Sequence, residues 1–480
     1  MHFPDRVYGI ENEFGVTCLY SDGTICDIDE LTSRDIHYGA FIKLKIIPHS
    51  VLAYGPGVSR LWHSNGGCTY IDTGTHPEHA TPECRSIRDV IRFNKAGERI
   101  CASIFEYPSN TNFRILLFKN NIGINEHGDI QAYFGCHENY LTYGVNAMKG
   151  DSTLAFIPFL ITRQILDGCG WWLNKDSFFF SPRALSMNHA LGDGTTGDRS
   201  IINKKGLGDA GDLKRLHLIL GDANILEFST YLKIGTTALV LSLIESGMTP
   251  ASPCPLPVEN MHELSRAYDP FAPLIHVDAY RCMSAFDIQT MYAQIVRKEL
   301  TYGEFDSEET EAELKQVMLA WEQTLNAIYN RDTPWMLGRI DHVTKKFLGD
   351  KATARHPSDE ELTQKNRLKD LDILYHGVTD RSLQERMDLQ WHDRRIVSEQ
   401  EILDAMIYPP RRTRATYRSA YVNLLARHND VHAEYIDWPT FGVTTENSPN
   451  LFKCPDPFVC DDEKFCEFME KAEKKYHIIS

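Results

Sequence analysis

Two glutamates near the amino terminus have the spacing of a carboxylate pair on one face of a strand. The sequence GIENEFG at residues 9–15 places Glu11 and Glu13 two positions apart. Alternate side chains of a strand share a face, so both carboxylates would point the same way. Mg²⁺ prefers oxygen ligands and is commonly completed by substrate phosphates. The pair indicates a nucleotide–metal anchor, with a solvated strand edge as the alternative.

A denser acidic group follows in NGGCTYIDTGTHPEHATPEC at residues 65–84. Asp72 ends a predicted strand, and Glu78 and Glu83 follow a turn that contains glycine. In this arrangement one carboxylate can act as a base while the others bind a metal. A well hydrogen-bonded turn fits the same residues, so the residues alone leave both interpretations open.

Two histidines lie in later strand-like segments. His137 precedes Glu138 in GCHENYL at residues 135–141. Neighbours on a strand face opposite sides, so at most one of these two points into a cleft. His217 alternates with Leu216 and Leu218, and a single strand histidine is more often a core or rim residue than a ligand.

The elements that must position these residues form an α+β pattern. Strand-like runs at 6–10, 68–72 and 114–119 predict a mostly antiparallel sheet, and helical spacing over 86–105 predicts a helix packed on it. Further helices are expected at 154–168, 229–245, 287–330, 360–375, 399–407 and 461–475, and a strand at 216–222. The prolines at 409 and 410 predict a boundary between a catalytic domain, 1–408, and a small carboxy-terminal domain, 409–480.

Composition excludes several classes of partner. The 480 residues include 50 Lys and Arg against 66 Asp and Glu, a net charge of −16. The electrostatic field of this negative charge repels nucleic acids and anionic lipids, so neither nucleic acid nor membrane is an expected partner. No secretory signal is recognised, and the 12 cysteines form no Cys-x-x-Cys pair. We expect a cytoplasmic protein with reduced thiols, in which Cys454, Cys460 and Cys466 are packing residues.

Taken together and in order, these motifs resemble those of the Pup ligase and depupylase family, which attaches or removes the small prokaryotic ubiquitin-like protein Pup. The resemblance extends over nearly the whole chain through FKNN at 118–121, PFLITRQ at 158–164, LKIGTTALVL at 232–241 and Asp437-Trp438. It implies a glutamine-synthetase-like fold, in which a curved antiparallel sheet forms a cradle for ATP and magnesium, followed by a small carboxy-terminal domain.

The resemblance also implies roles for individual residues. At the metal it places Glu11, Tyr70 and Glu78, with Asp72 as the catalytic carboxylate and Thr81 and Trp438 in contact with ATP. Four further candidates near the cleft are Glu13, Glu83, His137 and His217.

The implied reaction transfers a phosphoryl group from ATP to the side chain of Pup's terminal glutamate, giving an acyl phosphate that a target lysine attacks to form an isopeptide bond. A protonated lysine is not a nucleophile, so a base is needed, and Asp72 is the candidate. The three residues between Asp72 and His76, and the short stretch 18–64, favour the ligase branch. The alternatives are a depupylase or deamidase that hydrolyses the bond, a divergent amide ligase for another peptide or small molecule, and a nonenzymatic binding protein.

Two positions depart from the family pattern. Cys68 stands where the family has an arginine that holds ATP, so binding would weaken unless another arginine, such as Arg60 or Arg85, supplies the charge. The segment NKKGLGDAGD at 203–212 replaces a stretch with Arg, Glu and His, and leaves Lys204 and Lys205 as its cations.

Overall fold

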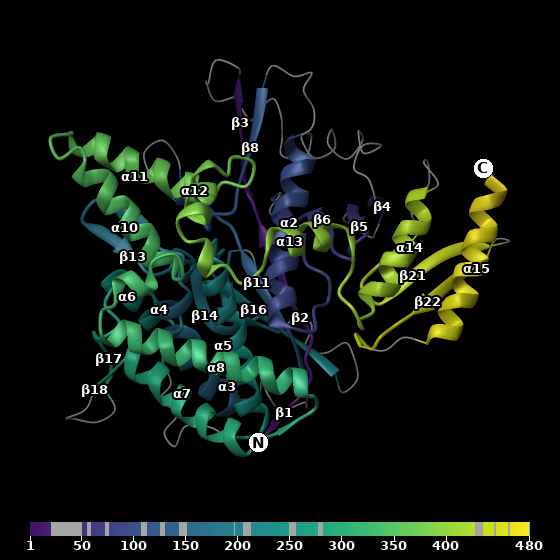
Figure 1. The fold of residues 1–480 in the computed structure, drawn as a ribbon, viewed down its shortest axis with the longest axis horizontal. Helices are drawn as coiled ribbons and strands as arrows, with labels where there is room; N and C mark the ends of the chain where they lie inside the picture. The colour runs from purple at the N-terminus through teal and green to yellow at the C-terminus, as the bar shows by residue number, and fades with distance from the viewer. Residues whose placement is uncertain are drawn as a thin grey trace. The chain divides into compact units, whose positions relative to one another are not determined.

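The computed structural model describes residues 1–20, 50–54, 59–72, 76–106, 113–124, 130–143, 151–195, 197–204, 213–248, 256–276, 282–427, 435–445, 448–458 and 461–479. The chain divides into two compact units (Figure 1). We call Met1–Arg6, Asn120–His376 and Arg381–Ile396 the helical unit, and Val7–Lys119, Gly377–Asp380 and Val397–Ser480 the carboxylate unit.

The carboxylate unit contains an antiparallel run of strands that carries most of the predicted site. Its order is β2 (Tyr8–Glu13), β7 (Pro77–Ala80), β6 (Cys68–Ile71), β5 (Ser59–His63) and β4 (Ser50–Tyr54). The β5–β6 turn uses Gly66 at φ +84°, a conformation that favours glycine, and Asn65 Oδ1 accepts from the Gly67 amide at 2.9 Å. A separate antiparallel pair joins β3 (Gly15–Tyr20) to β8 (Phe113–Phe118).

Helix α2 (Ile87–Glu106) packs against this sheet on the face opposite Glu78. The Ser86 hydroxyl accepts from the Asp89 amide at 3.0 Å and so supplies a cap at the start of the helix. Gly97 lies so close to His79 of β7 that a Cβ there would be 2.3 Å from the imidazole Cδ2. Helix α13 (Glu399–Ile407) runs beside α2, where Glu401 pairs with Arg88.

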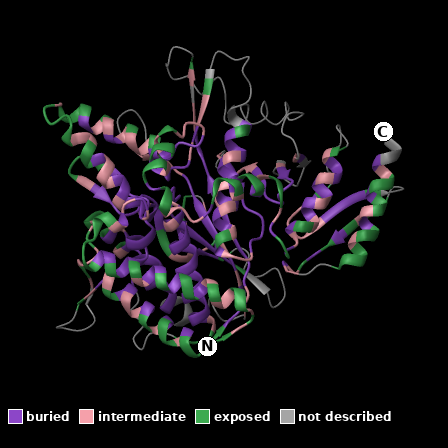
Figure 2. Ribbon diagram, viewed as in Figure 1, coloured by how far each residue is buried: buried purple, intermediate pink, exposed green. Residues whose placement is uncertain are grey.

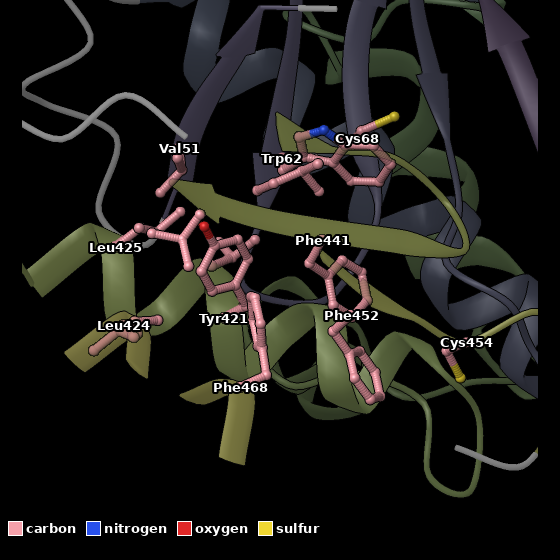
Figure 3. Packing of buried hydrophobic residues seen from close by; sticks show 14 of the residues in the cluster. Val51, Trp62, Cys68, Tyr421, Leu424, Leu425, Phe441, Phe452, Cys454 and Phe468 are labelled. Carbon is pink, nitrogen blue, oxygen red and sulfur yellow. The ribbon is translucent and has the colours of Figure 1, made fainter. Parts of the chain in front are cut away.

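The carboxy-terminal segment adds α14 (Ala415–Arg427), the three-stranded sheet β20 (Tyr435–Ile436), β21 (Thr440–Thr445) and β22 (Ser448–Lys453), and α15 (Asp462–Ile479). Its apolar residues share one buried cluster with the sheet that carries the carboxylates, and Figure 3 shows members from both parts. Trp62 and Cys68 contribute from the sheet, and Tyr421, Phe441 and Phe468 from the carboxy-terminal segment.

The cysteines correct part of the sequence analysis. Cys454 is buried in this cluster and is disulfide-bonded, so the prediction of a reduced thiol is wrong there. Cys466 is exposed as a free thiol, because α15 turns it away from the core, so its predicted packing role is also wrong. Cys460 lies outside the described residues.

In the helical unit, β16 pairs antiparallel with both β11 and β15, and β14 pairs parallel with β15. Its strands are β1 (His2–Phe3), β9 (Ile122–Ile124), β10 (Ile130–Tyr133), β11 (Cys136–Tyr143), β12 (Trp171–Asn174), β13 (Ser177–Phe179), β14 (Met187–Gly192), β15 (Arg199–Asn203), β16 (Leu213–Gly221), β17 (Pro273–His276), β18 (Cys282–Ser284) and β19 (Glu304–Phe305). Its α-helices are α3 (Asp151–Thr162), α4 (Gln164–Asp167), α5 (Glu227–Glu245), α6 (Glu259–Ala267), α7 (Ala285–Tyr302), α8 (Glu308–Tyr329), α9 (Thr333–Met336), α10 (Asp341–Ala354), α11 (Glu361–Tyr375) and α12 (Ser382–Gln390).

Burial follows the expected pattern of these elements. Nearly all of α5 is buried, whereas α8 alternates buried and exposed residues, as Figure 2 shows. The predicted helical stretch 287–330 is interrupted by β19, because the chain leaves the helical conformation at Gly303 and pairs with β1. Among the described residues no helix has both the length and the apolar character needed to cross a membrane. The α+β class is confirmed, while the curved cradle and the boundary at 408 stay predictions.

Candidate active site

The predicted acidic residues lie on one face of the carboxylate unit's sheet, in a row across its strands. Glu13 of β2 is directly opposite Glu78 of β7, and Glu78 is directly opposite Tyr70 of β6. Residues paired in this way share a face and have neighbouring side chains. Glu11, two residues before Glu13, points to the same side. We call this surface the acidic face.

Asp72 follows β6 directly, and a short backbone-closed turn fixes its carboxylate. The His76 amide donates to Asp72 Oδ1 at 2.7 Å, and the Asp72 amide donates to the His76 carbonyl at 3.0 Å. The His76 Nδ1 atom lies 3.4 Å from Glu13 Oε2 and 4.0 Å from Asp72 Oδ2. The turn therefore brings Asp72 and His76 to the acidic face; residues 73–75 lie outside the described residues.

The electrostatics of the acidic face disfavour its own negative charge. Burial, followed by the charges of Glu11 and Glu13, raises the pKa of Glu78 well above its ordinary value. Burial, followed by Glu78 and Glu11, likewise raises the pKa of the Tyr70 hydroxyl, which hydrogen-bonds Glu78. A cation bound here would relieve both effects, because it favours the ionised oxygens.

The donor atoms fit a hard divalent cation. One ligand atom each from Glu13, Asp72 and His76 lies within 4.8 Å of the others, close enough for all three to reach a single ion. Carboxylate oxygens are the ligands that Mg²⁺ prefers, and substrate phosphates commonly complete its octahedral shell. The arrangement can therefore hold a metal–phosphate group beside a carboxylate base.

Thr81 and Glu83, beyond the end of β7, have firm structural partners. Thr81 is buried, and its hydroxyl oxygen accepts from the Ile10 amide at 3.0 Å while keeping its own proton to donate. Glu83 accepts from Arg414 Nε at 2.6 Å and is paired with Arg418. Burial by itself would raise the Glu83 pKa, but Arg418 and Arg414 lower it to about 2. Glu83 is thus ionised at neutral pH, which suits it to positioning Arg418 and not to proton transfer.

Trp438 belongs to an aromatic and cationic stack beside the acidic face. Its ring meets that of Trp62 edge-to-face at 5.0 Å, and Trp62 is paired in register with Cys68. The Arg418 guanidinium lies 4.7 Å from the Trp438 ring centroid and donates to the Trp438 carbonyl at 2.8 Å. Sequence reasoning missed Arg418 and Trp62, since neither stands in a recognisable local motif.

His137 and His217 belong to the helical unit and are neighbours there. They are buried on adjacent strands, and their ring centroids are 5.1 Å apart. Glu138 faces the other side, where Arg163 Nη1 donates to it at 2.9 Å. The prediction that His137 and Glu138 point apart is confirmed, and the roles of both histidines stay predictions. Lys204 pairs with Asp193 at 3.5 Å, and Lys205 lies outside the described residues.

Comparison with known proteins identifies the family. Residues 6–441 match the family model described as Pup-ligase protein. The Pup–protein ligase of Nakamurella multipartita is 32% identical, over 97% of this chain and 99% of the relative. That of Acidimicrobium ferrooxidans is 30% identical, over 96% and 97%, and that of Mycobacterium tuberculosis 29%, over 96% and 98%.

Solved structures agree with the sequence relatives. The ligase PafA in its complex with the prokaryotic ubiquitin-like protein Pup superposes with a TM-score of 0.77 at 27% identity, covering 97% of this chain and 92% of that one. PafA in complex with ADP gives a TM-score of 0.70 at 25% identity, covering 94% and 95%. The family match extends over most of the chain and is joined by relatives of nearly equal length, so this chain belongs to the Pup ligase family.

Proposed function

We propose that this chain is an ATP-dependent ligase that joins the side chain of a Pup-like protein's carboxy-terminal glutamate to lysines of other proteins. The observation that carries the proposal is the acidic face, where Glu11, Glu13, Glu78 and Asp72 converge from neighbouring strands of a Pup ligase family member. The ligase relatives do not favour the hydrolytic alternative.

The acidic face would hold Mg²⁺ through Glu11, Tyr70 and Glu78. When bound, the ion would neutralise charge on the phosphates of ATP and on the transferred phosphoryl group. Thr81 would donate its free proton to the nucleotide, and Trp438 would contact it from the aromatic stack. The fit rests on the oxygen donors that Tyr70 and Glu78 present as neighbours on this face and on the raised pKa of Glu78.

Asp72 would accept the proton of the attacking lysine. The His76 amide occupies Asp72 Oδ1, which orients the carboxylate and leaves Oδ2 directed toward the His76 ring. A carboxylate base at this point would take a proton from the lysine ammonium group, and the neutral amine would then attack the carbonyl carbon of the acyl phosphate, so that the C–N bond forms as the C–O bond breaks and inorganic phosphate leaves. The resulting isopeptide bond requires both a Pup-like tag and a lysine-bearing protein as partners. The cytoplasmic location expected from the sequence stays a prediction.

Conjugation with the full chain tests this proposal. The protein is incubated with ATP, Mg²⁺, a Pup-like protein ending in glutamate and a lysine-bearing protein; we expect a conjugate of higher mass and one ADP per bond. Asp72→Asn should lower the conjugation rate at least 100-fold, because general base catalysis contributes about 10²–10⁴-fold. Binding of ATP to Asp72→Asn should change little.

The control is Asp404→Asn, which removes an exposed carboxylate of the same unit and should leave the rate unchanged. Conjugation by Asp72→Asn at the wild-type rate would contradict the assigned base. Cleavage of a preformed conjugate without ADP formation, and no conjugation, would favour the hydrolase instead.

A further inference from the structure

Arg60 extends the row of the acidic face by one strand. On β5 it is directly opposite Tyr70, just as Tyr70 is opposite Glu78 and Glu78 opposite Glu13. The four side chains therefore share one face of the sheet, ordered from carboxylate to cation. Adjacent strands are ~4.8 Å apart, so the Arg60 backbone lies about 10 Å from that of Glu78.

The position next to Arg60 on this face supplies no cation. Cys68 lies two residues before Tyr70, is fully buried, and burial raises the pKa of its thiol, which keeps it neutral. Arg418 is also fully buried, and its guanidinium donates to the Gly66 carbonyl at 2.8 Å, to the Trp438 carbonyl and to Glu83. Its charge is therefore committed to the protein.

Arg60, by contrast, has a guanidinium donor that no described residue accepts from. One Nη1 contact reaches Asp437 Oδ1 at 3.0 Å, and the guanidinium carbon lies 5.8 Å from the Tyr70 ring centroid. The Nε atom is buried yet makes no hydrogen bond to any described residue. A third of the side chain, 33%, is exposed, so an incoming anion can reach it.

We propose that Arg60 is a nucleotide-binding residue of this chain, which donates hydrogen bonds from its guanidinium to phosphate oxygens of Mg²⁺-bound ATP. The inference rests on the proposed function, since it requires the metal–phosphate group at Glu78. The planar guanidinium group of an arginine can donate two parallel hydrogen bonds to phosphate oxygens. Arg60 on β5 would supply the positive charge that Cys68 on β6 lacks. The pair with Asp437 occupies Nη1 of Arg60, so Nε and Nη2 would donate to the ligand, and the pair itself is not needed for binding.

Equilibrium binding of MgATP to the full chain, measured by titration calorimetry without Pup or a target protein, tests the assignment. Arg60→Gln should raise the dissociation constant of MgATP about 10- to 100-fold, which is the loss of affinity expected when charge-assisted hydrogen bonds are removed. The dissociation constant of Arg60→Lys should lie between those of Arg60→Gln and wild type, because lysine keeps the positive charge but lacks the paired donors of the guanidinium group. Arg99→Gln, a matched control that breaks a pair with exposed Glu399 on the other side of the sheet, should stay within twofold.

Asp437→Asn distinguishes a ligand-binding role of Arg60 from a purely structural role in its ion pair with Asp437. This variant loses the ion pair but keeps Arg60, so MgATP should bind as tightly as to wild type or more tightly. Equal weakening by Asp437→Asn and Arg60→Gln would overturn the proposal, as would Arg60→Gln binding within threefold of wild type. If the wild-type protein binds no MgATP, the proposed function itself is wrong. If the wild type binds MgATP and Arg60→Gln binds it with the same affinity, only the role of Arg60 is wrong.

Discussion

Replacing Arg418 with methionine should destabilise the carboxylate unit by several kcal/mol. Arg418 is fully buried, pairs with Glu83 and packs on the rings of Trp62 and Trp438. Arg418→Met retains much of the side-chain volume and removes the charge. Among the described residues, Glu83 then keeps Arg414 as its one ion-pair partner in a buried environment.

The magnitude follows from the Glu83 pKa, which the two arginines lower from 4.5 to about 2. At 1.36 kcal/mol for each pH unit this corresponds to roughly 3 kcal/mol. Removing one partner of a buried ion pair costs about 3–5 kcal/mol in general. We therefore expect Arg418→Met to lower the free energy of unfolding by about 3 kcal/mol at pH 7.

The pH dependence has a definite sign. Glu83 has a folded-state pKa below its unfolded-state value, so its stabilising contribution is complete above pH 4.5 and declines as the pH falls from 4.5 towards 2. The difference between wild type and Arg418→Met should be constant from pH 7 to pH 5 and should narrow below pH 4.5.

Urea unfolding followed by tryptophan fluorescence measures both effects. Glu83→Gln combined with Arg418→Met should cost less than the sum of the single changes, because the two residues interact directly. Arg88→Met breaks the exposed Arg88–Glu401 pair and serves as a control, with an expected cost below about 1 kcal/mol. A cost below 1 kcal/mol for Arg418→Met, or strict additivity with Glu83→Gln, would refute the reasoning.

Three further predictions concern the same unit. Gly97→Ala should lower the free energy of unfolding by about 1–3 kcal/mol despite alanine's higher helix propensity, since its Cβ would meet the His79 ring at 2.3 Å; a stabilised variant in urea unfolding contradicts this. Burial lowers the pKa of His79 to about 4, so the unfolded state binds an extra proton and stability falls by up to roughly 3 kcal/mol as the pH drops from 6.5 to 4; His79→Gln should flatten this loss. Glu78→Gln should raise the melting temperature of the nucleotide-free protein, because burial and then Glu11 and Glu13 disfavour its charge, and should reduce the stabilisation by MgATP; a lower melting temperature with an intact MgATP effect would argue against the metal site.

Local patterns predicted the elements of the carboxylate unit closely. The helix expected at 86–105 is α2 at Ile87–Glu106, and the one expected at 399–407 is α13 at Glu399–Ile407. Both have a serine cap and a regular apolar spacing, which are signals carried by adjacent residues. The two-residue spacing of Glu11 and Glu13 likewise sufficed to place them on one face.

What the sequence did not reveal depends on contacts between distant segments. Arg418 meets Glu83 from another part of the chain, 335 positions apart in sequence, so no local spacing could indicate the pair. The register that sets Arg60 opposite Tyr70 depends on the β5–β6 turn at Gly66. The split of 287–330 by β19 depends on pairing with β1, at the far end of the chain.

The shared apolar cluster makes the carboxy-terminal segment part of the scaffold beside the acidic face. Tyr421, Phe441 and Phe468 pack with Trp62 and Cys68, whose strands also carry Arg60 and Tyr70. Amino-acid changes in α15, far along the chain from Asp72 and Glu78, should therefore reduce enzymatic activity. A screen for loss of conjugation would recover such alleles in α15 as readily as in β6, and sorting them by nucleotide affinity would separate scaffold damage from lost reactive groups.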